Sequence, residues 1–171
     1  MRFVIVGLDI SSHALDACFL GGAPTWRRYD LDQGQSRFIE ARTVANLITW
    51  RDPAQTQVVV EHPFGAHRTT ALFNQVIGAF KAGVHPDALV WEVSAQDWRK
   101  ELAIKLGKGE KERAHIALLA WLRYVHPLLT EDRTGDQLDA LGLALAWERM
   151  QHRGQPDPRR WGASQGHALA S

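Results

Sequence analysis

The sequence predicts an α/β fold with a mixed, five-stranded sheet flanked by helices. Two short apolar stretches and a third that alternates weakly follow one another closely at the start of the chain, which is typical of an antiparallel meander. Two further apolar stretches alternate with segments of helical periodicity, and this alternation indicates parallel strands joined by helices. With 171 residues, 45% of them apolar, the chain is long enough to bury one sizeable core.

The first 93 residues carry all five predicted strands and two of the helices. We expect the strands at residues 3–9, 14–20, 26–31, 57–61 and 88–93, each an apolar or alternating run. Apolar side chains recur at helical spacing over residues 36–50, where Asp52-Pro53 ends the segment, and over residues 69–82, which Gly83 closes.

The rest of the chain is predicted to be helical up to about residue 150. Ser94 to Asp97 and Thr134 to Gln137 both match a capping box, so helices should begin there. Between them, the Gly- and Lys-rich stretch KLGKGEK interrupts the first helix, and a further helix covers residues 111–125. Residues 1–150 therefore form one domain, and residues 151–171, rich in Gly, Pro and Arg, are predicted to be a flexible basic tail.

Several classes of protein are disfavoured by composition. The sequence has no run of about 18 apolar residues and no secretory signal, so we expect a cytoplasmic protein that does not enter membranes. The single cysteine, Cys18, lies in an apolar run and is interpreted as a small buried hydrophobe. A net charge of +1 argues neither for nor against a nucleic-acid partner.

Four carboxylates stand where a metal site could form. Asp9 and Glu61 each end an apolar strand, and if these strands are neighbours both side chains leave the sheet at one edge. Asp136 and Asp139 are three apart on a predicted helix and so share a face. Oxygen-only ligand sets suit Mg²⁺ or Mn²⁺, and two such ions about 4 Å apart can hydrolyse a phosphodiester. Taken singly, each Asp could instead be a turn residue or a partner of the helix dipole.

The ordered motifs resemble the RuvC family of Holliday junction resolvases, which has a ribonuclease H-like fold. The resemblance covers residues 1 to about 150 and rests on GLDIS at residues 7–11, VVVE at 58–61 and DQLDALGLALA at 136–146. It implies that two Mg²⁺ (or Mn²⁺) ions per active site are held by Asp9, Glu61, Asp136 and Asp139.

Two secondary matches extend the resemblance to substrate contacts. Phe64 lies three residues after Glu61, where family members that stack a ring at the junction centre carry an aromatic residue; a Phe packed in the core is the alternative. Lys100 and Lys111 keep the eleven-residue spacing of a lysine pair in the family. We therefore expect Lys111 to assist catalysis. Phe64, Lys100, Lys108 and Arg113 are expected to contact the substrate.

The resemblance implies a structure-selective endodeoxyribonuclease of DNA recombination and repair. It would resolve four-way junctions by paired symmetric nicks, act as a homodimer, and use the helix at residues 69–82 as its dimer face. The alternatives are a nuclease for RNA or RNA–DNA hybrid, a transposase-like catalytic domain, a junction-binding protein without activity, and a sugar-kinase-like ATPase. No metal-binding spacing links the histidines, so we interpret His62, His67 and His115 as structural or peripheral.

Overall fold

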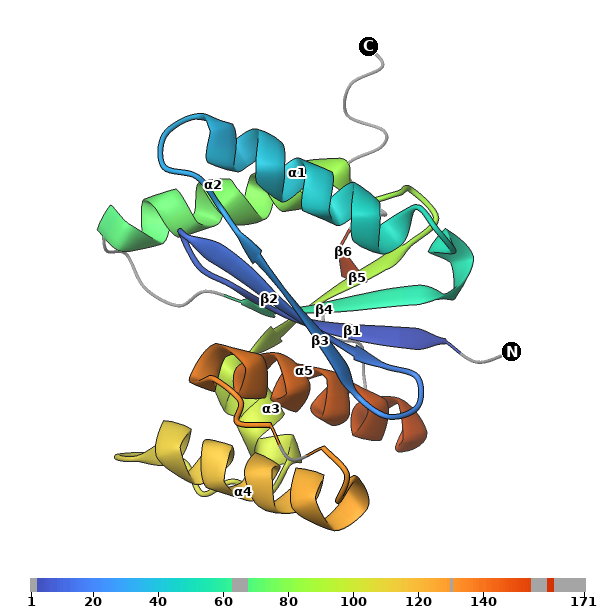
Figure 1. The fold of residues 1–171 in the computed structure, drawn as a ribbon, viewed down its shortest axis with the longest axis vertical. Coiled ribbons are helices and arrows are strands. Elements are labelled where there is room, and N and C mark those ends of the chain that lie inside the picture. The colour runs from blue at the N-terminus through green and yellow to red at the C-terminus, as the bar shows by residue number, and fades with distance from the viewer. Residues whose placement is uncertain (1–2, 63–67, 130, 155–159, 162–171) are drawn as a thin grey trace.

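The computed structural model describes residues 3–62, 68–129, 131–154 and 160–161. Its strands are β1 (Val4–Ile10), β2 (Ala14–Leu20), β3 (Thr25–Asp30), β4 (Thr56–His62), β5 (Leu89–Ser94) and β6 (Arg160–Trp161). Its helices are α1 (Ser36–Thr49), α2 (Arg68–Gly83), α3 (Ala95–Glu101), α4 (Glu110–Val125) and α5 (Gly135–His152), with a short 3₁₀ turn η1 (Pro53–Gln55) before β4. The strands form one mixed sheet in the order β3-β2-β1-β4-β5-β6 (Figure 1).

The predicted mixed sheet and its five strands are confirmed, and each strand lies within two residues of its expected position. β1, β2 and β3 form the antiparallel meander, and β4 and β5 continue the sheet as parallel strands. The structure adds β6, which pairs antiparallel with β5 inside the segment predicted to be a flexible tail. Two residues are too few to show the alternation that marks a strand in the sequence.

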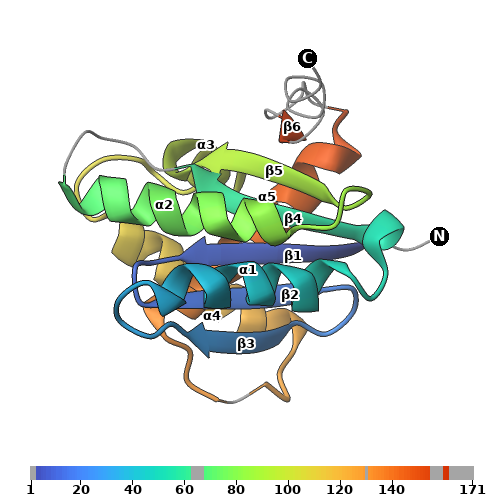
Figure 2. The same ribbon diagram turned by 90° about the horizontal axis from the view of Figure 1, so that it is seen from above.

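Helices cover both faces of the sheet, and each face has its own apolar core. α1 and α2 lie side by side on one face, whereas α5 and α3 lie on the other (Figures 1 and 2). α4 packs on α5 rather than on the sheet, so it forms an outer layer (Figure 1). Alternate residues of β1 supply the two cores: Val6, Leu8 and Ile10 belong to the core under α1 and α2, and Ile5 belongs to the core under α5.

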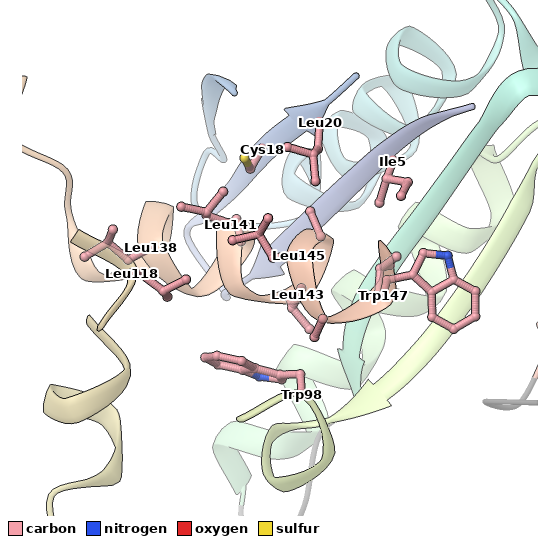
Figure 3. Packing of buried hydrophobic residues seen from close by; sticks show 14 of the residues in the cluster. Ile5, Cys18, Leu20, Trp98, Leu118, Leu138, Leu141, Leu143, Leu145 and Trp147 are labelled. Atoms are coloured by element: carbon pink, nitrogen blue, oxygen red, sulfur yellow. The ribbon is translucent and has the colours of Figure 1, made fainter. Parts of the chain in front are cut away.

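Close packing of α5 on β1 depends on Gly7. A Cβ atom at this position would lie 1.9 Å from the carbonyl oxygen of Ala140, so any larger residue would push the helix away from the strand. Leu141 and Leu145 fill the space between α5 and the first strands, and Leu143 lies toward Trp98 of α3 (Figure 3). The position of α5 relative to β1 is therefore tightly fixed.

Both predicted capping boxes mark true helix starts. The Ser94 hydroxyl accepts a hydrogen bond from the backbone N–H of Asp97 at 3.0 Å, and α3 begins at the next residue. At α5, Thr134 and Gln137 form a complete capping box through reciprocal side-chain and backbone bonds. Throughout the described ranges, every helix is too short or too polar to cross a bilayer.

Candidate active site

Asp9 and Glu61 lie at the same end of two adjacent parallel strands. Leu8 of β1 is in register with Val60 of β4, so the next residue of each strand is a carboxylate leaving the sheet at one edge. Because side chains alternate along a strand, both point away from the α1 and α2 core and toward α5. The shared edge predicted from the sequence is confirmed.

Asp136 and Asp139 meet these two carboxylates from α5. Asp139 is 4% exposed, and its negative charge acts on Asp9 together with those of Glu61 and Asp136. Burial, followed by the charges of Asp139, Glu61 and Asp136, raises the pKa of Asp9 to about 8, although Lys111 acts in the opposite direction. At neutral pH and without a further positive charge, Asp9 is therefore mostly protonated.

Two side chains of α4 hold Asp139. Lys111 Nζ lies 2.9 Å from Asp139 Oδ2, and His115 Nε2 lies 2.9 Å from Asp139 Oδ1. Burial favours a lower pKa for Lys111, but the bond to Asp139 and the nearby carboxylates outweigh it, and the pKa is raised. His115 was expected to be structural or peripheral, and it contacts Asp139. It stands four residues after Lys111, so the helix presents both side chains to the same carboxylate.

Glu61 is bonded from a different direction, by α3. Trp98 Nε1 donates a hydrogen bond to Glu61 Oε2 at 2.9 Å. Burial raises the pKa of Glu61, and the bond from Trp98 and the positive charge of Arg99 act against this increase. Arg99 NH1 lies 2.7 Å from Glu110 Oε1, which ties α3 to the start of α4. Sequence analysis did not single out Trp98 or Arg99 for the site.

A fifth carboxylate, Asp16, also belongs to this face. It is the register partner of Asp9 on β2 and is buried. Arg28 of β3 lies 2.7 Å from Asp16 Oδ2 and 3.8 Å from Asp136 Oδ2, so one guanidinium group links two carboxylates. Sequence analysis missed both residues, although an Asp alternating with apolar residues in a strand opposite Asp9 was a usable signal.

The predicted basic residues are not all brought to the carboxylates. Lys111 contacts Asp139, whereas Lys100, at the end of α3, and Lys108, before α4, are exposed. Arg113 donates hydrogen bonds to the carbonyl oxygens of Lys105 and Lys108, so it supports the loop before α4. Phe64 and His67 lie outside the described residues.

The donor set suits a hard divalent cation. Four carboxylates repel one another in a partly buried site, and a cation would let Asp9 ionise at neutral pH. In the conformation described, both oxygens of Asp139 are engaged by Lys111 and His115. Within the described ranges, no three His, Cys, Asp or Glu side chains yet converge on one point. Binding a cation would therefore require the carboxylates to move closer together.

Solved structures share this fold, although sequence comparisons find no related protein. Neither a family model nor a curated protein matches the chain significantly. A solved structure of Thermus thermophilus RuvC in complex with a Holliday junction substrate superposes with a TM-score of 0.68 over 92% of this chain and 100% of that one, at 17% identity. The chain has the RuvC fold. A second Thermus thermophilus RuvC structure matches with a TM-score of 0.64, 19% identity and the same coverage of both chains.

The match to RuvC confirms the ribonuclease H-like fold class predicted from the sequence. It covers 92% of this chain and all of the RuvC chain. Low identity explains why the likeness appears in the structure and not in a sequence comparison, since a core keeps its pattern while most individual residues change.

Proposed function

We propose that this protein is a metal-dependent endonuclease that cuts branched DNA, with the four-way junction as its principal substrate. The observation that carries the proposal is the set Asp9, Glu61, Asp136 and Asp139 at one sheet edge. Burial, together with the charges of the other three carboxylates, raises the pKa of Asp9 to about 8. The fold supports the choice of substrate, because the Thermus thermophilus RuvC that shares it binds a Holliday junction substrate.

The four carboxylates would hold two Mg²⁺ or Mn²⁺ ions. When bound, such ions lower the pKa of an attacking water and stabilise the leaving oxygen of a phosphodiester. The protein's part is to keep the ligands deprotonated and correctly placed. Trp98 holds one oxygen of Glu61, and the tight packing of α5 on Gly7 holds Asp136 and Asp139 near β1.

Lys111 would assist at the scissile phosphate. Its side chain is 52% exposed while its ammonium group contacts Asp139, so it can reach a bound backbone without leaving the site. A cation here would offset negative charge that develops on the phosphate during cleavage. Lys100, Lys108 and Arg113 would contact DNA farther from the cut, and Phe64 would stack on an unpaired base at the branch point.

A homodimer would match the two-fold symmetry of a four-way junction, which needs two matched incisions. α2 is our candidate for the dimer face because Val76, Ile77 and Phe80 bury one side of it, while its other side, with Asn74 and Gly78, is exposed. Light scattering coupled to size-exclusion chromatography tests this. A monomer at the concentrations used for cleavage would exclude the arrangement.

The decisive experiment is denaturing-gel mapping of nicks on an end-labelled four-way junction. Duplex, flap and RNA–DNA hybrid substrates run beside it, each with Mg²⁺, with Mn²⁺ and with a chelator. Asp136→Asn is the matched control, because it removes one charge and keeps the shape of the side chain. We expect paired symmetric nicks with 5′-phosphate and 3′-hydroxyl ends that need the metal and disappear in the variant.

Other outcomes would revise the proposal in defined ways. Stronger cutting of flap or of RNA–DNA hybrid would keep the metal site and change the substrate. Tight junction binding without cutting under any metal would identify a binding protein instead. Activity that survives both the chelator and Asp136→Asn would contradict the metal-dependent mechanism.

A further inference from the structure

The hydrogen bond between Trp98 and Glu61 points to a role for α3 in the site. Trp98 is completely buried, and its indole N–H is placed 2.9 Å from Glu61 Oε2. We propose that Trp98 is a positioning residue that fixes the Glu61 carboxylate for binding a divalent cation. The inference deepens the proposed nuclease function and rests on it.

The indole ring is held in place by α5. A Cβ atom at Gly142 would lie 2.6 Å from Trp98 Cζ3, so the ring presses directly against the helix backbone and only glycine leaves room for it. Gly142 lies three residues after Asp139, about one helical turn away. Figure 3 shows the ring beneath α5, next to Leu143. Trp98 therefore connects Glu61 of β4 to the helix that carries Asp139.

α3 itself is anchored at both ends. Ser94 is in register with His62, the residue after Glu61, and its side chain caps the helix that begins directly after β5. Near the C-terminal end of α3, Arg99 forms an ion pair with Glu110 at the start of α4. A helix of seven residues that is fixed in this way has little freedom to move relative to β4.

The chemistry of the bond explains why an indole is suited to this task. A carboxylate that is mostly buried needs a donor, and a neutral N–H satisfies one oxygen without adding a positive charge that would compete with a cation. Lysine or arginine at the same place would reduce the attraction for a divalent ion. The bond also restricts rotation of the carboxylate, so less conformational entropy is lost when the ion binds.

Trp147 provides a matched control within the same core. It is 3% exposed, and its Nε1 donates a hydrogen bond to Gln57 Oε1 at 2.9 Å, at the start of β4 and far along the strand from Glu61. Trp98→Phe and Trp147→Phe therefore each remove one buried indole and one hydrogen bond of the same length. Only the first change touches the carboxylate site.

The test is Mn²⁺ binding by isothermal titration calorimetry, with thermal unfolding of the metal-free variants measured alongside. We expect Trp98→Phe to raise the Kd for Mn²⁺ about tenfold, in line with the loss of an outer partner of a metal ligand. Trp147→Phe should change this Kd by less than about twofold, although both variants lose thermal stability. Equal Mn²⁺ affinities in the two variants would overturn the inference.

Cleavage kinetics separate positioning from general damage. At saturating Mn²⁺, Trp98→Phe should regain most of the wild-type kcat while its KM for the junction stays unchanged. A loss that excess Mn²⁺ does not rescue would indicate a purely structural role. Should Trp98→Phe fail to fold, benzothienylalanine at position 98 keeps the ring shape and removes the N–H, and the same tenfold change is expected.

The inference and the proposed function fail in different ways. Wild-type protein that neither binds Mn²⁺ nor cuts any branched substrate would remove the proposed function, and the positioning role with it. Wild-type protein that does both, with Trp98→Phe indistinguishable from Trp147→Phe, would leave the function standing and remove the role of Trp98.

Discussion

The two faces of the sheet carry their charges very differently. On the α1 and α2 face, the buried side chains of Lys81 and Glu92 form an ion pair, and buried Arg37 donates to the carbonyl oxygens of Ser12 and Gly34. On the α5 face, Asp9, Asp16 and Asp139 join Glu61 and Asp136 in a cluster whose net charge is negative even with Lys111 and Arg28 beside it.

The α1 and α2 face therefore contributes mainly to the stability of the fold, whereas the α5 face carries the candidate site. An excess of like charge in a partly buried site destabilises the fold, and the apolar contacts elsewhere must offset it. The same excess makes the site attractive for cations. β1 serves both purposes, because its alternate residues point to opposite faces.

Replacing a carboxylate on the charged face should have the largest effect on activity. We expect Asp9→Asn to lower junction cleavage by at least about 10²-fold, as when one electrostatic contact to the transition state is removed. Its metal-free form should melt at the same temperature as the wild type or higher, because an amide at this position is neutral without taking up a proton. Cleavage gels and calorimetry check both, and a destabilised variant would contradict the account of the cluster.

Replacing Leu8, which precedes Asp9 but points to the α1 and α2 face, should reduce stability and leave the metal site unchanged. Leu8 is fully buried beneath α1 and α2, so Leu8→Ala should reduce the free energy of unfolding by about 2–5 kcal/mol. Mn²⁺ affinity of the folded variant should stay close to the wild-type value. Urea unfolding and metal titration together test this, and a large loss of metal affinity would show that the two faces are not independent.

The charged face should also make stability depend on pH. Asp9 has a pKa of about 8 in the fold and 3.8 as its ordinary value, so the folded state binds the proton more tightly. This contribution is complete below about pH 4 and is lost as pH rises toward 8, at a cost on the order of 6 kcal/mol. The free energy of unfolding of the metal-free wild type minus that of Asp9→Asn, measured by urea unfolding at several pH values, should show this decline. A flat difference would disprove the shifted pKa.

Lys111 should have the smallest of these effects. Lys111→Ala should lower kcat about tenfold, because one cation near the scissile phosphate is lost, and the fold should be unchanged. Arg42→Ala is the control, since Arg42 is exposed on α1 at the other face. Equal rates in the two variants would exclude a role for Lys111 in turnover.

Much of the fold could be predicted because it depends on local patterns. A nearly continuous run of apolar residues marks β2, and Thr134 with Gln137 marks the start of α5. β6 could not be predicted, since its two residues pair through the backbone and carry no pattern of their own.

The site residues that could be predicted are likewise those that belong to local patterns. The strand-end positions of Asp9 and Glu61 and the spacing of Asp136 and Asp139 are visible in the sequence. Trp98 was missed because its bond to Glu61 joins residues 37 apart and requires the exact placement of α3. The contact of His115 with Asp139 was not predicted, because it joins residues 24 apart and depends on how α4 packs on α5.

β6 has a consequence for how the protein behaves at high concentration. The backbone of an outermost strand can recruit a strand from another molecule, which begins edge-to-edge aggregation. At one border of the sheet, β6 covers Val90 and Trp91 of β5; at the other, Arg27 and Arg28 place charge on β3. A chain shortened before residue 160 would expose the first border, so preparations of such a truncation should lose solubility even though the carboxylate site is intact.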